Sequence, residues 1–141
     1  MKIIKFEEKY RDDLIFMILQ AKDAIGRIPK LNEELLNIKE SYFNKQDMFW
    51  IALDDCDRVI GCVGTKTQTD FIWVKRLYVK VALKRQGIGS QLLKCVEEFA
   101  KENGINKLKV HLGGKEYFES YSFYPKHGFE EVEKDYMEKR I

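Results

Sequence analysis

The hydrophobic positions of this chain change their spacing from one segment to the next, and the two spacings indicate helices and strands. Apolar residues recur every three or four positions in a helix and alternate with polar residues in a half-buried strand. The pattern predicts strands at residues 4–6, 48–53, 58–69, 71–81 and 108–112, one or two more within 129–141, and helices at 7–24, from 32 onward, at 87–103 and at 116–124. This order predicts an α/β (α+β) fold with helices packed on a mixed sheet.

Size and composition narrow the class of protein. The 141 residues are expected to form one domain, residues 1–141, and the 45% share of hydrophobic residues excludes a disordered chain. A net charge of only +2 gives no indication of a nucleic-acid or membrane partner. The early charges and the lack of an apolar run of ~18–20 residues predict a cytoplasmic protein, either a monomer or a homodimer. Three cysteines without a C-x-x-C pair and two histidines predict no metal site.

A basic loop with two glycines, between a strand and a helix, carries the clearest chemical signal. It reads Lys84-Arg85-Gln86-Gly87-Ile88-Gly89-Ser90. The first N–H groups of a helix are unpaired and its dipole is positive there, so this arrangement is typical of a phosphate site. The alternative is that the glycines only let the loop and the helix pack closely. The surroundings favour the phosphate site, because residues 71–96 hold no acidic residue. Their six basic residues are expected to form one positive patch: Lys75, Arg76, Lys80, Lys84, Arg85 and Lys94.

This segment resembles the central motif of the GNAT superfamily of N-acetyltransferases, Arg/Gln-x-x-Gly-x-Gly/Ala after a strand with an apolar-x-Val end. Leu77-Tyr78-Val79 and residues 84–89 match it, except that Lys84 stands where Arg or Gln is usual. A second segment, residues 123–129, reads Phe-Tyr-Pro-Lys-His-Gly-Phe and resembles the family's C-terminal Phe-Tyr-x-x-x-Gly-Phe. The resemblance implies a GNAT-like, mostly antiparallel central sheet of six to seven strands flanked by about four helices.

The resemblance also implies acetyl-CoA as the co-substrate. Backbone N–H groups from Arg85 to Ser90 would hold its pyrophosphate, and the strand edge at 77–79 would pair with its pantetheine. The residues assigned to the cofactor are Leu77, Tyr78, Val79, Lys84, Arg85, Gln86, Gly87, Ile88, Gly89 and Ser90.

Tyr124 is the general acid that the resemblance implies, because a phenol is protonated at neutral pH and can return a proton to the leaving thiolate. The local sequence by itself favours a core aromatic, since aromatic residues crowd positions 117–124. Pro125 is expected to end or kink the helix here. No carboxylate lies on the strand before the loop, so Glu119, His111 or a water are the candidate bases.

The acceptor is expected to be a primary amine of a small molecule or peptide. Arg27, Trp73 and Glu119 are the candidate acceptor-binding residues, with the linker at 25–30 lining the pocket. The leading hypothesis is an acetyl-CoA-dependent N-acetyltransferase. The alternative is a non-catalytic acyl-CoA-binding sensor module, which the missing carboxylate and Pro125 favour.

Overall fold

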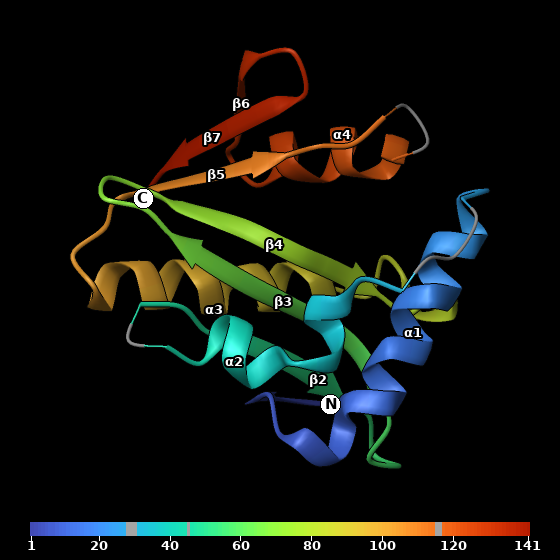
Figure 1. Cartoon of the computed structure of the whole chain (residues 1–141). Helices are drawn as coiled ribbons and strands as arrows, with labels where there is room; N and C mark the ends of the chain where they lie inside the picture. The colour runs from blue at the N-terminus through green and yellow to red at the C-terminus, as the bar shows by residue number, and fades with distance from the viewer. Residues whose placement is uncertain (28–30, 45, 115–116) are drawn as a thin grey trace.

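The computed structural model describes residues 1–27, 31–44, 46–114 and 117–141 (Figure 1). Its elements are β1 (Lys2–Lys5), η1 (Glu8–Tyr10), α1 (Arg11–Ala24), η2 (Glu33–Leu36), α2 (Ile38–Tyr42), β2 (Phe49–Leu53), β3 (Val59–Thr67), β4 (Ile72–Val79), η3 (Val81–Leu83), α3 (Ile88–Glu102), β5 (Lys107–His111), α4 (Phe118–Lys126), β6 (Glu130–Glu133) and β7 (Tyr136–Arg140), where η marks a 3₁₀ helix. No helix in the described part of the chain is long and apolar enough to cross a membrane.

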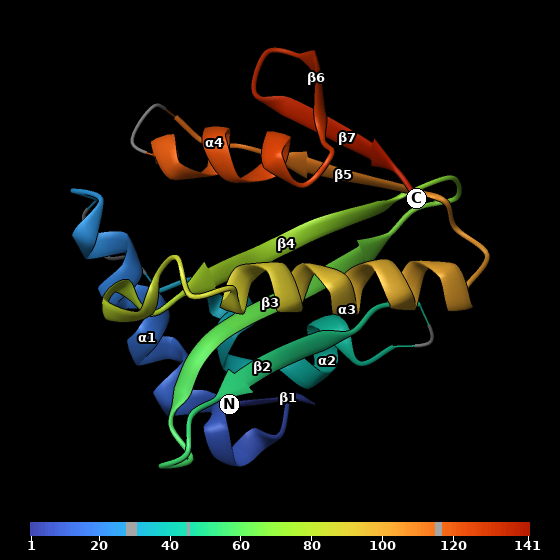
Figure 2. The ribbon, with the colours of Figure 1, turned by 180° about the vertical axis from the view of Figure 1, so that it is seen from behind.

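The strands form one seven-stranded sheet in the order β1-β2-β3-β4-β5-β7-β6. Every neighbouring pair is antiparallel except β4 and β5, which run parallel. Helices α1 and α2 cover one face of the sheet, and α3 and α4 lie on the other, as the two opposite views show (Figures 1 and 2). The mostly antiparallel sheet and its four α-helices confirm the expected fold class.

The protein has two hydrophobic cores, one on each face of the sheet, because successive side chains of a strand point to opposite faces. In β2, Ile51 and Leu53 face α1 and α2, whereas Trp50 and Ala52 face α3. Both sides of this strand are buried because it lies between two helical layers, which explains its continuous apolar sequence.

A bulge in β4 changes which of its side chains face which layer. The register between β3 and β4 shifts between Cys62 and Gly64, and Arg76 adopts a left-handed conformation with φ of +54°. Before the bulge, Ile72 and Val74 join the core under α3; after it, the odd-numbered Leu77 does so instead. Lys75 already faces away from α3 by the alternation of the strand, and the extra residue places Arg76 on that face as well.

The sheet opens between β4 and β5. The two strands pair only at Ile72 with Leu108 and at Trp73 with Lys109, and then diverge. Beyond Trp73, the edge of β4 that would face β5 has no strand partner in the described part of the chain. This opening ends where β4 leads into η3 and α3 (Figure 2).

Two expectations about helices are corrected. The helix expected from residue 32 is two short ones, η2 and α2, because Asn37 between them leaves helical geometry with φ −133° and ψ 53°. Helix α4 continues through Pro125 and ends one residue later at Lys126, so the expected end at residue 124 is corrected. Pro125 has no N–H to donate to the carbonyl four residues earlier, so it removes one hydrogen bond from the last turn of α4. The expected start of this helix, residue 116, lies outside the described residues.

Candidate functional site

The loop after β4 leaves the first turn of α3 uncapped. Gly87 stands at the N-cap position with φ of +83°, a conformation that favours glycine, and makes no side-chain cap hydrogen bond. No acidic residue lies in the first turn of α3. The N–H groups at this end therefore retain the capacity to bind an anion, as the sequence predicts.

Gly89 has a role in packing that does not depend on binding a phosphate. A Cβ atom at this position would lie 3.2 Å from Cε1 of Phe123 and 3.7 Å from Cγ2 of Val79. The missing side chain thus lets the start of α3 approach α4 closely. Gly89 therefore supports a contact between two helices, which differs from the packing of the loop against its own helix that the sequence offered as the alternative to a phosphate site.

Ser90 also connects α3 to α4. The Nδ1 atom of His127 lies 2.8 Å from the carbonyl oxygen of Phe123, and its Nε2 atom lies 2.7 Å from Oγ of Ser90. Because the carbonyl can only accept, a neutral His127 carries its proton on Nδ1 and accepts at Nε2 from the Ser90 hydroxyl. The backbone N–H of Ser90, rather than its hydroxyl, is then the group suited to a phosphate.

Tyr124 combines a core ring with an unpaired hydroxyl. The side chain is 5% exposed, and its ring packs edge-on against Phe123 and Phe129. Its hydroxyl makes no hydrogen bond to a described residue, yet it is not among the fully enclosed polar atoms. Burial, and to a smaller extent Tyr78, raises the pKa of Tyr124 well above its ordinary value. A phenol in this environment keeps its proton at neutral pH.

Lys84 and Glu119, predicted for different parts of the site, contact each other. The Nζ atom of Lys84 lies 3.3 Å from Oε2 of Glu119, and both side chains are partly exposed. The contact links the loop to the first turn of α4. An incoming phosphate would compete with Glu119 for the same ammonium group.

Two of the three residues predicted for the acceptor, Arg27 and Trp73, lie in different places. Arg27 donates a hydrogen bond to the hydroxyl of Tyr117, immediately before α4, so it reaches from the end of α1 to the opening. Trp73 lies at the vertex of the opening, where β4 last pairs with β5, and contacts Phe71 and Tyr136. Arg27 and Trp73 are therefore not neighbours in one pocket. Residues 28–30 of the predicted linker lie outside the described residues.

The basic residues of β4 and the loop do not form the single patch that we expected. Arg76 turns toward η2, where its Nη2 and Nε atoms lie 2.5 and 2.6 Å from Oε1 of Glu34. Lys75 lies over the ring of Trp73, at 5.4 Å from its centroid. Both are on the face of α1 and α2, whereas Lys84 points toward α4. The bulge accounts for the position of Arg76, which would otherwise lie on the α3 face.

Sequence reasoning assigned Tyr78 to the cofactor but missed Lys22 and Asn32, which lie on the α1 side of the opening. Lys22 is buried, and Asn32, at the N-cap of η2, makes no side-chain cap hydrogen bond. Tyr78 is partly buried on this face, and burial followed by nearby Tyr117 raises its pKa. The only sequence signal was the position of Lys22, four residues after the buried Ile18 on the apolar stripe of α1.

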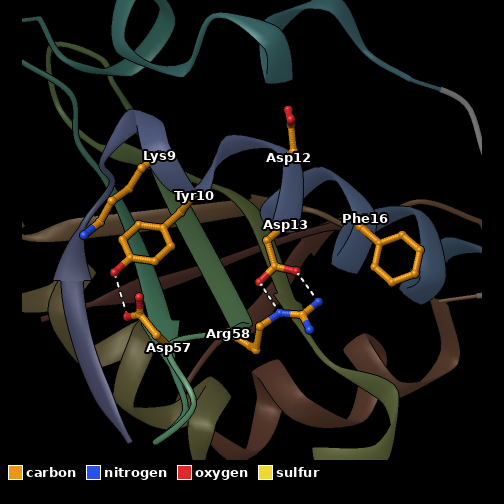
Figure 3. Close-up of a pocket in the computed structure, with 7 residues that line it drawn as sticks. All are labelled: Lys9, Tyr10, Asp12, Asp13, Phe16, Asp57 and Arg58. Atoms are coloured by element: carbon orange, nitrogen blue, oxygen red, sulfur yellow. Dashed lines mark hydrogen bonds and ion pairs between the residues drawn. The ribbon is translucent and has the colours of Figure 1, made fainter.

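A separate hollow lies at the opposite end of α1, beside the turn between β2 and β3 (Figure 3). Two interactions cross it: Arg58 contacts Asp13 at 2.8 Å, and the hydroxyl of Tyr10 donates to Asp57 at 2.7 Å. None of the residues predicted for the site lines this hollow.

Comparison with known proteins assigns the chain to a family. Residues 45–131 match the family described as Acetyltransferase (GNAT) domain. The chain is 29% identical over 100 residues to Probable N-acetyltransferase 14 of Xenopus tropicalis, a match that covers 70% of this chain and 47% of that protein. The chain belongs to the GNAT acetyltransferase family, and it spans about half the length of this curated relative.

Solved structures show the same fold over the whole chain. An acetyltransferase of the GNAT family from Staphylococcus aureus has a TM-score of 0.90 at 21% identity, covering 99% of this chain and 98% of that one. The PaiA N-acetyltransferase from Thermoplasma acidophilum, solved in complex with coenzyme A, has a TM-score of 0.81 at 23% identity with the same coverage of 99% and 98%. The GNAT-like fold that the two motifs imply is therefore confirmed.

Proposed function

We propose that this chain transfers the acetyl group of acetyl-CoA to a primary amine. The observation that carries the proposal is the opening between β4 and β5, whose free strand edge leads directly to the uncapped start of α3. An extended chain with amide groups can pair with such an edge, and a pyrophosphate can bind at such a helix end. The coenzyme A in the Thermoplasma structure supports the choice of ligand.

Different segments of the chain would bind different parts of the cofactor. The backbone of Leu77 to Val79 would pair with the pantetheine, and N–H groups from Arg85 to Ser90 would bind the pyrophosphate. Lys84 would add a positive charge on release from Glu119. The cofactor would thus run along the free edge of β4 to the start of α3, beside the contact of Gly89 with Phe123 that brings α3 and α4 together.

In the proposed reaction, a neutral amine attacks the thioester carbonyl and forms the C–N bond. The backbone N–H of Val79 would stabilise the oxyanion that develops on the carbonyl oxygen. When the C–S bond breaks, the thiolate would take the proton of Tyr124, and the phenolate would recover a proton from solvent. Tyr124 is protonated at neutral pH, as a general acid must be, while its raised pKa makes it a weaker proton donor than an ordinary tyrosine.

His111 is the better placed of the two candidate bases. It is exposed on β5 just beyond the last pair with β4, on the face of Trp73 and Lys109, and it stacks on Tyr136. Glu119 is instead held by Lys84. We propose that a water in contact with His111 accepts the proton that the amine loses.

Acetyl-CoA binding and release of the CoA thiol test this proposal together. Calorimetry should detect binding of acetyl-CoA, and a thiol reagent should detect CoA only when an amine is supplied. The assay should use a Cys56→Ser background, because Cys56 is exposed, whereas burial raises the pKa of Cys62 to about 12 and keeps that thiol unreactive. Binding without turnover on any amine would support the sensor, and no binding would overturn both functions.

The pair Lys84 and Glu119 provides a matched control. Lys84→Gln should weaken acetyl-CoA binding about 10-fold, since it removes one charge-assisted contact to phosphate. Glu119→Gln removes the other half of the same ion pair but should leave the affinity unchanged or slightly higher, because it frees Lys84. Equal losses in both variants would mean that the ion pair only holds the loop in place.

A further inference from the structure

Aromatic side chains gather over β4, β5 and β7 on the face of the sheet opposite α3 and α4. Leu108, Val110 and Met137 point into the core under α3, so their neighbours along each strand point the other way. Figure 1 looks onto this second face, and no helix of the described part of the chain lies in front of β5 and β7 there. Three rings on this face contact one another in series, and we call them the ring platform: Trp73, Tyr136 and His111.

His111 and Tyr136 form a stack that is directed toward the opening between β4 and β5. The two residues are paired across β5 and β7, and their ring centroids lie 4.4 Å apart with an interplanar angle of 16°. Rings that are nearly parallel at this separation face each other, so the outer face of the His111 ring is turned away from β7 and toward β4. His111 is exposed. A ring of a ligand can therefore continue the stack.

The divergence of β4 from β5 provides space beside the outer face of His111. The pairing of the two strands ends with Trp73 and Lys109, so a longer parallel ladder would place Lys75 opposite His111. The Nζ atom of Lys75 lies instead over the ring of Trp73, 5.4 Å from its centroid. The side chain of Lys75 is thus directed back toward the vertex of the opening, away from the position beside His111.

Trp73 borders this position on the side where β4 and β5 meet. Its ring centroid lies 6.0 Å from that of Tyr136, although β5 separates their two strands. Neighbouring strands are about 4.8 Å apart, so the side chain of Trp73 must lean across β5 to come this close. A ligand stacked on His111 would therefore meet a second aromatic ring at the vertex.

The lysines of the chain already make the cation–π contacts on this face. Lys75 lies over Trp73, and Lys109 lies over Phe71 at 4.6 Å from its centroid. Lys109 is also 3.8 Å from the carboxylate of Glu138. A further ammonium group near these rings would meet like charges, whereas an uncharged ring would not. The platform therefore suits an acceptor with a single amine and an uncharged aromatic body better than a polyamine.

We propose that the acceptor is a primary amine joined by a short alkyl chain to an aromatic ring, and that this ring stacks on His111 beside Trp73. This inference rests on the proposed acetyl transfer and names its substrate class. Stacking at this position places the amine in the opening, where the free edge of β4 would hold the thioester. A stacked ring covers the face of His111, so the nitrogen atoms at its edge can still contact the water that accepts the proton of the amine.

Two amines that differ in the type of ring test the stacking. The ratio of kcat/KM for phenethylamine to that for cyclohexylethylamine should be about 3- to 10-fold higher in the wild type than in Tyr136→Leu, as expected for one aromatic pair. Tyr136→Phe is the matched control, because it keeps the ring that positions His111 and should retain the high ratio. The two amines differ in basicity equally in every protein, so the change in the ratio measures the platform alone.

Trp73→Leu is a second variant that leaves β7 untouched. It removes the ring at the vertex and should also lower the ratio. Spermidine should be a poorer acceptor than phenethylamine in the wild type.

Tryptophan fluorescence detects binding to the platform without turnover. The chain has two tryptophans, and Trp50 is buried in the core under α3, on the opposite face of the sheet. Phenethylamine, added with or without CoA, should change the emission of the wild type. It should not change that of Trp73→Phe, in which only Trp50 emits.

The results distinguish this inference from the proposed function. Acetyl transfer with the same amine ratio in the wild type, Tyr136→Leu and Trp73→Leu, or a preference for spermidine, would overturn the aromatic acceptor alone. Phenethylamine that leaves the emission of Trp73 unchanged while it is acetylated would also overturn the platform. An emission change at Trp73 in a protein that does not bind acetyl-CoA would support the platform and overturn the transferase.

Discussion

The hydroxyl of Tyr124 is a single group on which the proposed chemistry depends. Its ring fills the core between Phe123 and Phe129, so a large substitution would confuse packing with catalysis. Tyr124→Phe removes the oxygen and keeps the ring. If the phenol protonates the thiolate, turnover should fall by roughly 10²–10⁴, while acetyl-CoA affinity stays within a factor of two or so.

Turnover and thermal unfolding of this variant distinguish the two roles of Tyr124. Because the hydroxyl makes no hydrogen bond to a described residue, its removal should leave the Tm near that of the wild type. Wild-type turnover in the phenylalanine variant would show that the residue is only part of the core. Stopped-flow release of CoA, measured with saturating amine, is the appropriate assay.

At the scale of elements, the contact between α3 and α4 controls the shape of the cofactor site. Gly89→Ala would place a Cβ atom 3.2 Å from the Phe123 ring, so one helix must move by a few tenths of an ångström. We expect a loss of about 1–3 kcal/mol in unfolding free energy and weaker acetyl-CoA binding, since the first turn of α3 moves with the helix.

A double mutant tests whether the contact with Phe123 causes this loss. Phe123→Leu removes the ring edge, so Gly89→Ala should cost less in this background than in the wild type. Urea unfolding of the four proteins in the cycle measures the coupling. Strictly additive effects would assign the cost of Gly89→Ala to something other than this contact.

At the scale of the whole molecule, three buried phenols predict how stability depends on alkaline pH. Burial is the largest cause of the raised pKa of each of Tyr42, Tyr78 and Tyr124. Below the unfolded-state pKa of about 10, both states hold these protons and the phenols cause no pH dependence. Above it, the unfolded chain loses protons that the folded chain retains, so the free energy of unfolding falls as pH rises.

Each phenol can contribute a slope of up to about 1.4 kcal/mol per pH unit in this range. The free energy of unfolding, measured by urea titration at a series of pH values from neutral to strongly alkaline, should decline less steeply in Tyr124→Phe than in the wild type. The difference between the two proteins removes the contribution of lysine titration. Parallel declines would show that Tyr124 ionises equally easily in both states.

The sequence alone was sufficient for features that depend on near neighbours. Burial on one side of an element imposes a period of two or about 3.6, so the order of strands and helices followed from the apolar positions. The loop at residues 84–90 was recognisable because a helix start with glycines has its own local chemistry. This loop motif and the second motif at residues 123–129 together implied the GNAT family, which the comparison confirms.

Only the tertiary structure decided on which faces of the sheet the charged residues lie. The bulge at Arg76 arises from pairing with β3, and no local period marks it; it places Arg76 on the face away from α3. Arg76 and Glu34 are 42 residues apart in the chain, and Arg27 and Tyr117 are 90 apart. Such partners are chosen by how the layers pack, because electrostatic contacts depend on distance in space and not on spacing along the sequence.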